Sequence, residues 1–146
     1  MIYEPVILNQ HDLQTVHIEL DNGNVSTIRE EKNIPQALEK LGLAGEYVPC
    51  GGNADVWIQE REQWHSGANF FAIGPGKLLG YSRNVHTLQA LESHNFKILK
   101  AKDILTGKSD QQQYPRYVAA IEGSELSRGG GGCRCMTLPI RRASNT

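Results

Sequence analysis

The chain has 146 residues, of which 39% are hydrophobic and 21% are charged, as is typical of one globular domain with room for a core. Its formal net charge of −1, with both signs interspersed, gives no basic surface for nucleic acid or an anionic membrane. No apolar run reaches the ~20 residues of a membrane span, and the first residues lack the pattern of a signal peptide. Three cysteines, an odd number, favour a reducing compartment, so we expect a cytoplasmic location with neither nucleic acid nor membrane as partner.

The first 50 residues predict strand, strand, helix and strand in that order. Side chains alternate over residues 13–20 with the two-residue period of a strand. The Asn-Gly pair within residues 21–24 predicts a tight turn before a returning strand at 25–29. Asn33 is a typical N-cap for the helix that follows, and residues 46–50 predict the next strand.

The same order returns after residue 68. Residues 69–73 and 77–81 predict a second hairpin around a Gly-Pro-Gly turn. Residues 85–94 then predict a helix, with Asn84 as its cap, and residues 96–100 another strand. A unit that occurs twice indicates an architecture built by repetition.

The segment between the two units predicts a helix at residues 56–64. In it we expect Arg61 and Glu62 to form a solvated pair and Trp64 to anchor the core. The single domain, residues 1–146, is thus expected to have three parts: a first ββαβ module at residues 1–50, a connecting segment at 51–68, and a second module with the closing segment at 69–142.

After the second unit, residues 106–113 predict a surface loop and residues 117–121 a further strand. The chain then passes through four consecutive glycines, residues 129–132, into Cys133, Arg134 and Cys135.

Glycines let the backbone approach a ligand closely and turn several N–H groups toward one point. Together with Arg128 or Arg134, such amides lower the pKa of a thiol and prepare it as a nucleophile. The alternative is a flexible turn before a strand whose cysteines pack as small hydrophobic residues. A metal site is a weaker interpretation, because Cys-x-Cys offers two ligands where structural zinc needs about four.

Three groups of motifs resemble the arginine deiminase family, in order and spacing. Residues 49–53 (PCGGN) and 61–69 (REQWHSGAN) are similar to the family's PCGG, REQW and xxGxN segments. Residues 73–76 (IGPG) and 80–84 (GYSRN) resemble its APG and YDRN hairpin. Residues 123–139 resemble its closing SELSRGRGGPRCMSMP motif. The resemblance runs from about residue 46 to residue 142 and is looser before it.

The resemblance implies an α/β fold, as part of the five-bladed pentein propeller of the guanidine-modifying enzymes, with about two ββαβ modules in this chain. It also implies a hydrolase of arginine catabolism that acts on the C–N bond of a linear amidine. A cysteine attacks the guanidinium carbon of arginine, ammonia leaves, and water releases citrulline from the covalent intermediate. By motif position Cys135 is that nucleophile, and Arg128, Gly129, Gly130 and Arg134 line the substrate site. No metal or organic cofactor is implied.

Three departures from the family's pattern bear on this hypothesis. The family's catalytic histidine lies in an HLD-type motif, and its guanidinium-binding carboxylates also lie upstream. Residues 11–13 (HDL) have those letters in another order and are not taken as the match. Gly130 stands where the family usually has an arginine for the substrate carboxylate, Ser82 where it has an acidic residue, and Cys133 where it often has Pro or Gly.

A cysteine without a proton donor for the leaving amine loses about 10²–10⁴-fold in rate from general acid catalysis. Three hypotheses therefore stand. The first is an amidine hydrolase whose remaining groups come from a separate N-terminal half or a longer parent protein. The second is a non-catalytic binding or assembly module of the pentein fold. The third is self-assembly, in which another copy covers exposed edges.

Overall fold

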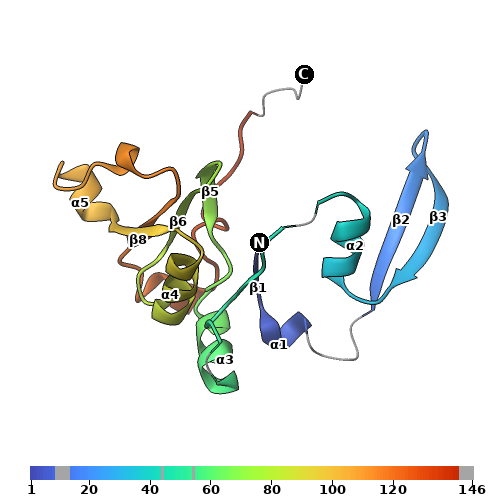
Figure 1. Cartoon of the computed structure of the whole chain (residues 1–146), viewed down its shortest axis with the longest axis horizontal. Helices are drawn as coiled ribbons and strands as arrows, with labels where there is room; N and C mark the ends of the chain where they lie inside the picture. The colour runs from blue at the N-terminus through green and yellow to red at the C-terminus, as the bar shows by residue number, and fades with distance from the viewer. Residues whose placement is uncertain (9–13, 44, 54, 142–146) are drawn as a thin grey trace.

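The computed structural model of the chain describes residues 1–8, 14–43, 45–53 and 55–141. It is a mixed α/β structure, and the strands described form three small sheets (Figure 1). No helix within these ranges is both long enough and apolar enough to cross a membrane. Residues 9–13, which include the His-Asp-Leu letters, lie outside the described residues.

The largest sheet has four strands in the order β5-β6-β8-β7. The antiparallel hairpin of β5 (Phe71–Gly74) and β6 (Lys77–Tyr81) is followed in the sheet by β8 (Tyr117–Ile121) and β7 (Lys97–Lys100). β8 lies between two parallel neighbours and, because both faces of the sheet are covered, it is buried at four of its five residues. The predicted strands at 77–81 and 117–121 are confirmed with their bounds.

Helices cover both faces of this sheet. On one face, α4 (Val85–Ser93) packs Leu88 and Leu91 against Val118 of β8. On the other face, α5 (Ala101–Leu105) covers a cluster that includes Tyr117. Successive residues of β8 therefore belong to clusters on opposite faces of the sheet, as the two-residue period of a strand requires. The sequence predicted α4 but not α5.

The N-terminal residues join the same body through a short parallel pair. β1 (Ile2–Tyr3) pairs with β4 (Val48–Pro49), and α1 (Pro5–Leu8) follows β1 directly. Val48 is 4% exposed and belongs to the cluster under α4. The strand predicted at 46–50 is thus shorter than expected, and its partner β1 was not predicted. Toward the other end lie two short 3₁₀ turns, η1 (Gln111–Gln113) and η2 (Leu126–Gly129).

The hairpin of β2 (Thr15–Asp21) and β3 (Asn24–Glu31) forms a sheet of its own with α2 (Ile34–Lys40) beside it (Figure 1). The predicted cap of α2 is confirmed, because the Gln36 N–H donates to Asn33 Oδ1 over 3.0 Å. The apolar face of the hairpin is 49–66% exposed, and it consists of five aliphatic residues: Val16, Ile18, Leu20, Val25 and Ile28. A two-stranded sheet of this kind has little stability without further packing.

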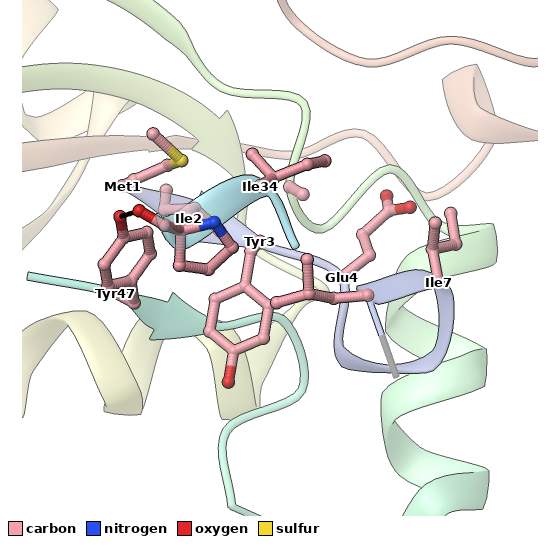
Figure 2. Close-up of a pocket in the computed structure, with 10 residues that line it drawn as sticks. Met1, Ile2, Tyr3, Glu4, Ile7, Ile34 and Tyr47 are labelled. Carbon is pink, nitrogen blue, oxygen red and sulfur yellow. Dashed lines mark hydrogen bonds between the residues drawn. The ribbon is translucent and has the colours of Figure 1, made fainter. Parts of the chain in front are cut away.

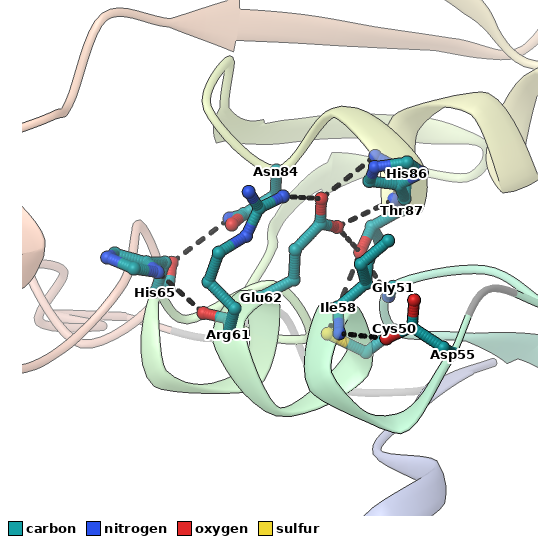
Figure 3. Close-up of polar contacts among 10 residues, drawn as sticks. All are labelled: Cys50, Gly51, Asp55, Ile58, Arg61, Glu62, His65, Asn84, His86 and Thr87. Atoms are coloured by element: carbon teal, nitrogen blue, oxygen red, sulfur yellow. Dashed lines mark hydrogen bonds and ion pairs between the residues drawn. The ribbon is translucent and has the colours of Figure 1, made fainter.

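α3 (Val56–Trp64) directs one carboxylate into the core (Figure 3). Glu62 is 1% exposed and accepts the backbone N–H groups of His86 and Thr87 over 2.9 and 2.8 Å, and the Thr87 hydroxyl over 2.6 Å. Those two N–H groups belong to the first turn of α4, where a helix has unpaired donors and attracts negative charge. Glu62 therefore caps a helix to which it does not belong.

This arrangement corrects three sequence expectations. Glu62 is buried and not part of a solvated pair, although Arg61 Nη2 lies 3.5 Å from its carboxylate. Trp64 is 81% exposed and not a core anchor, because residues two apart on a helix point about 200° apart and Glu62 takes the inward direction. Asn84 occupies the N-cap position of α4, but its side chain donates to the carbonyl of His65 over 3.0 Å and caps nothing.

A buried thiol completes this contact. Cys50 is fully buried, and the neighbouring Gly51 N–H donates to the Thr87 hydroxyl oxygen over 2.8 Å. A Cβ on Gly67 would lie 2.5 Å from the Cys50 sulfur, so a residue without a side chain is required there. Burial raises the pKa of the Cys50 thiol to about 11, which keeps it protonated and unreactive near neutral pH.

We expect Glu62→Ala to lower the free energy of unfolding by about 2–4 kcal/mol, because two buried N–H groups of α4 and the Thr87 hydroxyl lose their acceptor. The matched control is Glu60→Ala on the same helix, which should change stability by less than about 0.5 kcal/mol. Urea denaturation followed by circular dichroism measures both. Equal denaturation midpoints for the two variants would contradict this role of Glu62.

Candidate functional site

The site lies in the closing segment, where the glycine run leads into a tight turn. Gly130 and Gly131 have φ angles of +81° and +89°, a left-handed conformation that glycine adopts without strain. The turn that follows closes where the Thr137 N–H donates to the carbonyl oxygen of Arg134 over 3.1 Å. It carries Cys135 on the surface.

One side-chain amide holds the turn and its thiol together. The Nδ2 group of Asn69 donates to the Cys135 sulfur over 2.8 Å, and its Oδ1 accepts the Arg134 N–H over 3.1 Å. The backbone of Gly132, then Asn69 and the charge of Arg134 lower the pKa of Cys135 below its ordinary value. These contacts stabilise the thiolate, which is the reactive form.

The other two thiols differ in this respect. Cys133 is 4% exposed, and burial raises its pKa, as it does for Cys50. Among the three cysteines of the chain, Cys135 alone combines exposure to solvent with a lowered pKa. The structure thus distinguishes between two cysteines that lie two residues apart.

Gly132 is required by its contact with Asn69. A Cβ on Gly132 would lie 2.6 Å from the Cβ of Asn69 and 2.8 Å from its backbone oxygen. A Cβ on Gly129, which has an ordinary φ, would have no atom within 4 Å. The four glycines therefore have different roles: two supply left-handed backbone, and Gly132 allows Asn69 to reach the turn.

The other residues predicted for the site are less closely grouped. Arg134 donates its backbone N–H to Asn69, and its guanidinium donates to the Thr137 hydroxyl over 3.1 Å. The Arg128 side chain is 78% exposed and pairs with Glu125 over 3.1 Å. The structure thus joins Arg134 and Cys135 through Asn69 but gives Arg128 a surface partner.

Asn69 was not predicted as a site residue. It was visible only as the last letter of the REQWHSGAN motif, which gives no sign that its side chain meets a turn 66 residues later.

A second contact ties the β5–β6 hairpin to the closing segment. Arg83, just after β6, donates to the carbonyl oxygen of Ser124 over 2.7 Å and to the Ser127 hydroxyl over 3.3 Å. A Cβ on Gly123 would lie 2.4 Å from the ring of Tyr81, so this segment packs against the last residue of β6. The motifs at 80–84 and 123–139 therefore meet in space.

The described surface has several cavities, of which one lies beside the turn and another near the N-terminal residues. One of about 540 Å³ is lined by Phe70, Arg134 and Leu138 among others, beside the turn but without Cys135 in its wall. Another, of about 300 Å³, is largely apolar and lies where β1, α1 and Tyr47 meet (Figure 2). Burial raises the pKa of Glu4 in its wall. Within the described residues, no three His, Cys, Asp or Glu side chains gather as they would to hold a metal ion.

Fold and site together define an α/β protein that presents one stabilised thiol on a glycine-rich turn. The family model described as arginine deiminase matches residues 1–142, and the chain belongs to that family. The match includes the first 45 residues, where the motif resemblance was looser.

Curated relatives agree with this membership. The arginine deiminase of Listeria innocua is 34% identical over 142 residues, which cover 96% of this chain and 30% of the relative. That of Oenococcus oeni is 34% identical over 140 residues, covering 94% and 29%, and that of Streptococcus uberis 32% over 133 residues, covering 90% and 27%. The chain therefore spans about 30% of the length of the curated relatives it matches, in their C-terminal part.

We expect Asn69→Ala to raise the pKa of Cys135, because the thiolate loses a hydrogen-bond donor. Half-maximal alkylation by iodoacetamide should then move to higher pH, and the rate at neutral pH should fall. Asn53→Ala, which removes an exposed amide, is the control and should leave the profile unchanged. An unshifted profile in Asn69→Ala would show that this contact does not tune the thiol.

We expect Gly132→Ala to destabilise the chain by about 1–3 kcal/mol, because the added methyl group displaces Asn69. Gly129→Ala, which adds the same group in open space, is the matched control and should cost less than about 0.5 kcal/mol. Urea denaturation gives both values. A Gly132→Ala protein as stable as the control would mean that the close contact is not maintained in solution.

Proposed function

We propose that this chain is the thiol-bearing part of an arginine deiminase-like amidine hydrolase. The observation that carries the proposal is the exposed Cys135, hydrogen-bonded by Asn69 within a chain of that family. The Cys135 thiolate attacks the guanidinium carbon of arginine, and the C–N bond to the departing ammonia breaks. Water then cleaves the thioether bond of the intermediate and releases citrulline and the thiolate.

The proposed substrate site includes Arg128, Gly129, Gly130 and Arg134. Positive φ at Gly130 and the open space beside Gly129 leave backbone groups accessible to the far end of a substrate. Gly130 offers no side chain for a substrate carboxylate, so specificity for arginine over other guanidines rests on other contacts. The reaction needs no metal or organic cofactor in this proposal.

The remaining catalytic groups, a histidine acid/base and carboxylates for the guanidinium, are proposed to come from further polypeptide, in a separate chain or a longer parent. In this view the chain contributes part of a pentein propeller, with modules at residues 1–50 and 69–142 joined by the segment 51–68. Two exposed apolar surfaces support it. One is the β2–β3 face, and the other is the pair of tryptophans on α3, which are 80% and 81% exposed. A cytoplasmic location is proposed from the free thiols.

A second candidate, a non-catalytic assembly module, is favoured by the same β2–β3 face and by Gly130. In this version a second copy of the chain covers the five aliphatic residues of that face, as an isologous contact between two hairpins. The two candidates predict different behaviour of the isolated chain. A strictly monomeric mass in light scattering removes the self-assembly version.

We expect the chain alone to produce no citrulline, and the N-terminal part of the Listeria innocua relative, added in trans, to restore production. Cys135→Ser should lower the restored activity at least about 10⁴-fold, because the nucleophile is lost. The control Cys50→Ser removes a buried thiol outside the closing segment and should retain activity if circular dichroism shows that the variant is folded. A colorimetric citrulline assay measures all three.

The positive control is the relative's own C-terminal part, combined with the same N-terminal part. If that pair is active and this chain binds the N-terminal part without making citrulline, the hydrolase proposal fails. Alkylation of Cys135 in the bound state gives a second readout. Protection by arginine supports a working pocket, whereas an ordinary, unprotected thiol supports the non-catalytic module.

A further inference from the structure

The turn that carries Cys135 also carries a second thiol, which the proposed reaction does not use. Cys133 lies two residues earlier and is 4% exposed, whereas Cys135 faces solvent. Cα atoms two residues apart are separated by at most about 7 Å, and a turn shortens that distance. A separation within that limit is compatible with the range of about 4.4–6.8 Å between the Cα atoms of disulfide-linked cysteines.

Tyr81 is a third residue beside the turn that carries the two thiols. The pKa of Tyr81 is raised by burial and then by the charges of Cys133 and Cys135. The hydroxyl of Tyr81 also donates to the sulfur of Met136 over 3.9 Å, at the end of the same turn.

The backbone before the turn has the freedom that a new cross-link needs. Gly130 and Gly131 are left-handed, and glycine changes between conformations at little steric cost. A Cβ on Gly131 would lie 3.1 Å from the Cβ of Cys135, so the backbone already approaches this cysteine closely. A side chain at position 131 would crowd Cys135.

From this geometry we infer that Cys133 and Cys135 form a reversible redox site, in which Cys135 is oxidised first and Cys133 resolves it as an intramolecular disulfide. The oxidant is a hydroperoxide, the class that reacts with exposed, hydrogen-bonded thiolates. Cys133 is shielded from solvent, so it does not meet the oxidant first.

The chemistry balances in two steps. The Cys135 thiolate attacks the terminal oxygen of the hydroperoxide, the O–O bond breaks, and hydroxide (from hydrogen peroxide) or alkoxide (from an organic hydroperoxide) leaves. The thiolate thereby loses two electrons and becomes a sulfenic acid. The Cys133 sulfur then attacks the Cys135 sulfur, an S–S bond forms and the S–O bond breaks. The hydroxide that leaves accepts the proton of the Cys133 thiol and forms water. A dithiol reverses the reaction by two exchanges and is itself oxidised.

The disulfide removes the nucleophile while it lasts and prevents oxidation of Cys135 to the irreversible sulfinic acid. The disulfide would regulate activity only if the proposed hydrolase function holds, because only then is the Cys135 thiolate needed for turnover. The bond itself does not depend on that function. It would form in a non-catalytic module as well.

The test treats the purified full chain with a small excess of hydrogen peroxide and maps its peptides without reduction. We expect a product lighter by two hydrogen atoms, with Cys133 linked to Cys135, which dithiothreitol converts back to thiols. Cys133→Ser should instead keep oxygen on Cys135, with a dimedone-reactive sulfenic acid and at least about tenfold more sulfinic acid than the native chain. The matched control Cys50→Ser, which removes the remaining cysteine, should form the same disulfide as the native chain.

Two results would overturn the inference. One is a native chain whose Cys135 reaches sulfinic acid as fast as in Cys133→Ser. The other is a peptide map that lacks the Cys133–Cys135 link, which decides the question even if Cys133→Ser does not fold. Neither readout needs arginine. If the chain forms the disulfide but never supports citrulline production, the proposed function fails and the inference about the disulfide stands.

Discussion

The buried carboxylate of Glu62 is the contact on which the arrangement around the site depends. Several kcal/mol oppose the burial of a charge unless donors surround it, and here the first turn of α4 and the Thr87 hydroxyl supply them. α3 and α4 are thereby fixed at one point. The carbonyl of the same residue accepts the Gly67 N–H over 2.8 Å, which sets the turn after α3. The Asn69 N–H then donates to Ser66 over 3.0 Å, and Asn69 reaches Cys135.

This sequence of contacts gives physical content to the motifs. PCGG supplies the buried Cys50 and the Gly51 N–H that meets Thr87, REQW supplies Glu62, and the final asparagine of the next segment supplies the amide at the thiol. The hairpin motif contributes Arg83, which holds the segment before the glycine run. Segments that lie far apart in the sequence therefore determine the environment of one sulfur atom. Hydrogen-bond donors and a nearby cation stabilise the thiolate in this way, and the described residues contain both.

Periodicity and turn chemistry predicted the elements well where the pattern is local. The Asn-Gly turn, the cap at Asn33 and the strands at 77–81 and 117–121 follow from neighbouring residues and are confirmed. Apart from the missed helix α5, the errors concern long-range contacts. Trp64 has the size of a core residue, but the orientation of its helix is set by Glu62, whose partners are 24 and 25 residues away. For the same reason Asn84 has the sequence of a cap while a distant carboxylate does the capping. Asn69 could not be assigned because a lone asparagine carries no signal of its partner.

If the proposed function holds, the described residues meet only part of what guanidine chemistry requires. Lowering the pKa of a thiol needs only amides and a nearby cation, and Gly132, Asn69 and Arg134 provide them within one turn and its neighbour. Holding a guanidinium needs negative charge in a partly dry site, and exposed carboxylates such as Glu125, already paired with Arg128, are too well solvated to supply it.

The apolar β2–β3 face is likewise incomplete in its packing. Its aliphatic residues alternate as they would in a buried sheet, yet they are about half or more exposed. One physical change, coverage of these surfaces by further polypeptide, would supply both the buried contact for the hairpin and a drier environment in which carboxylates could bind a cation. The lowered pKa of the Cys135 thiol and the presence of groups that would hold a guanidinium are therefore separate properties of the molecule.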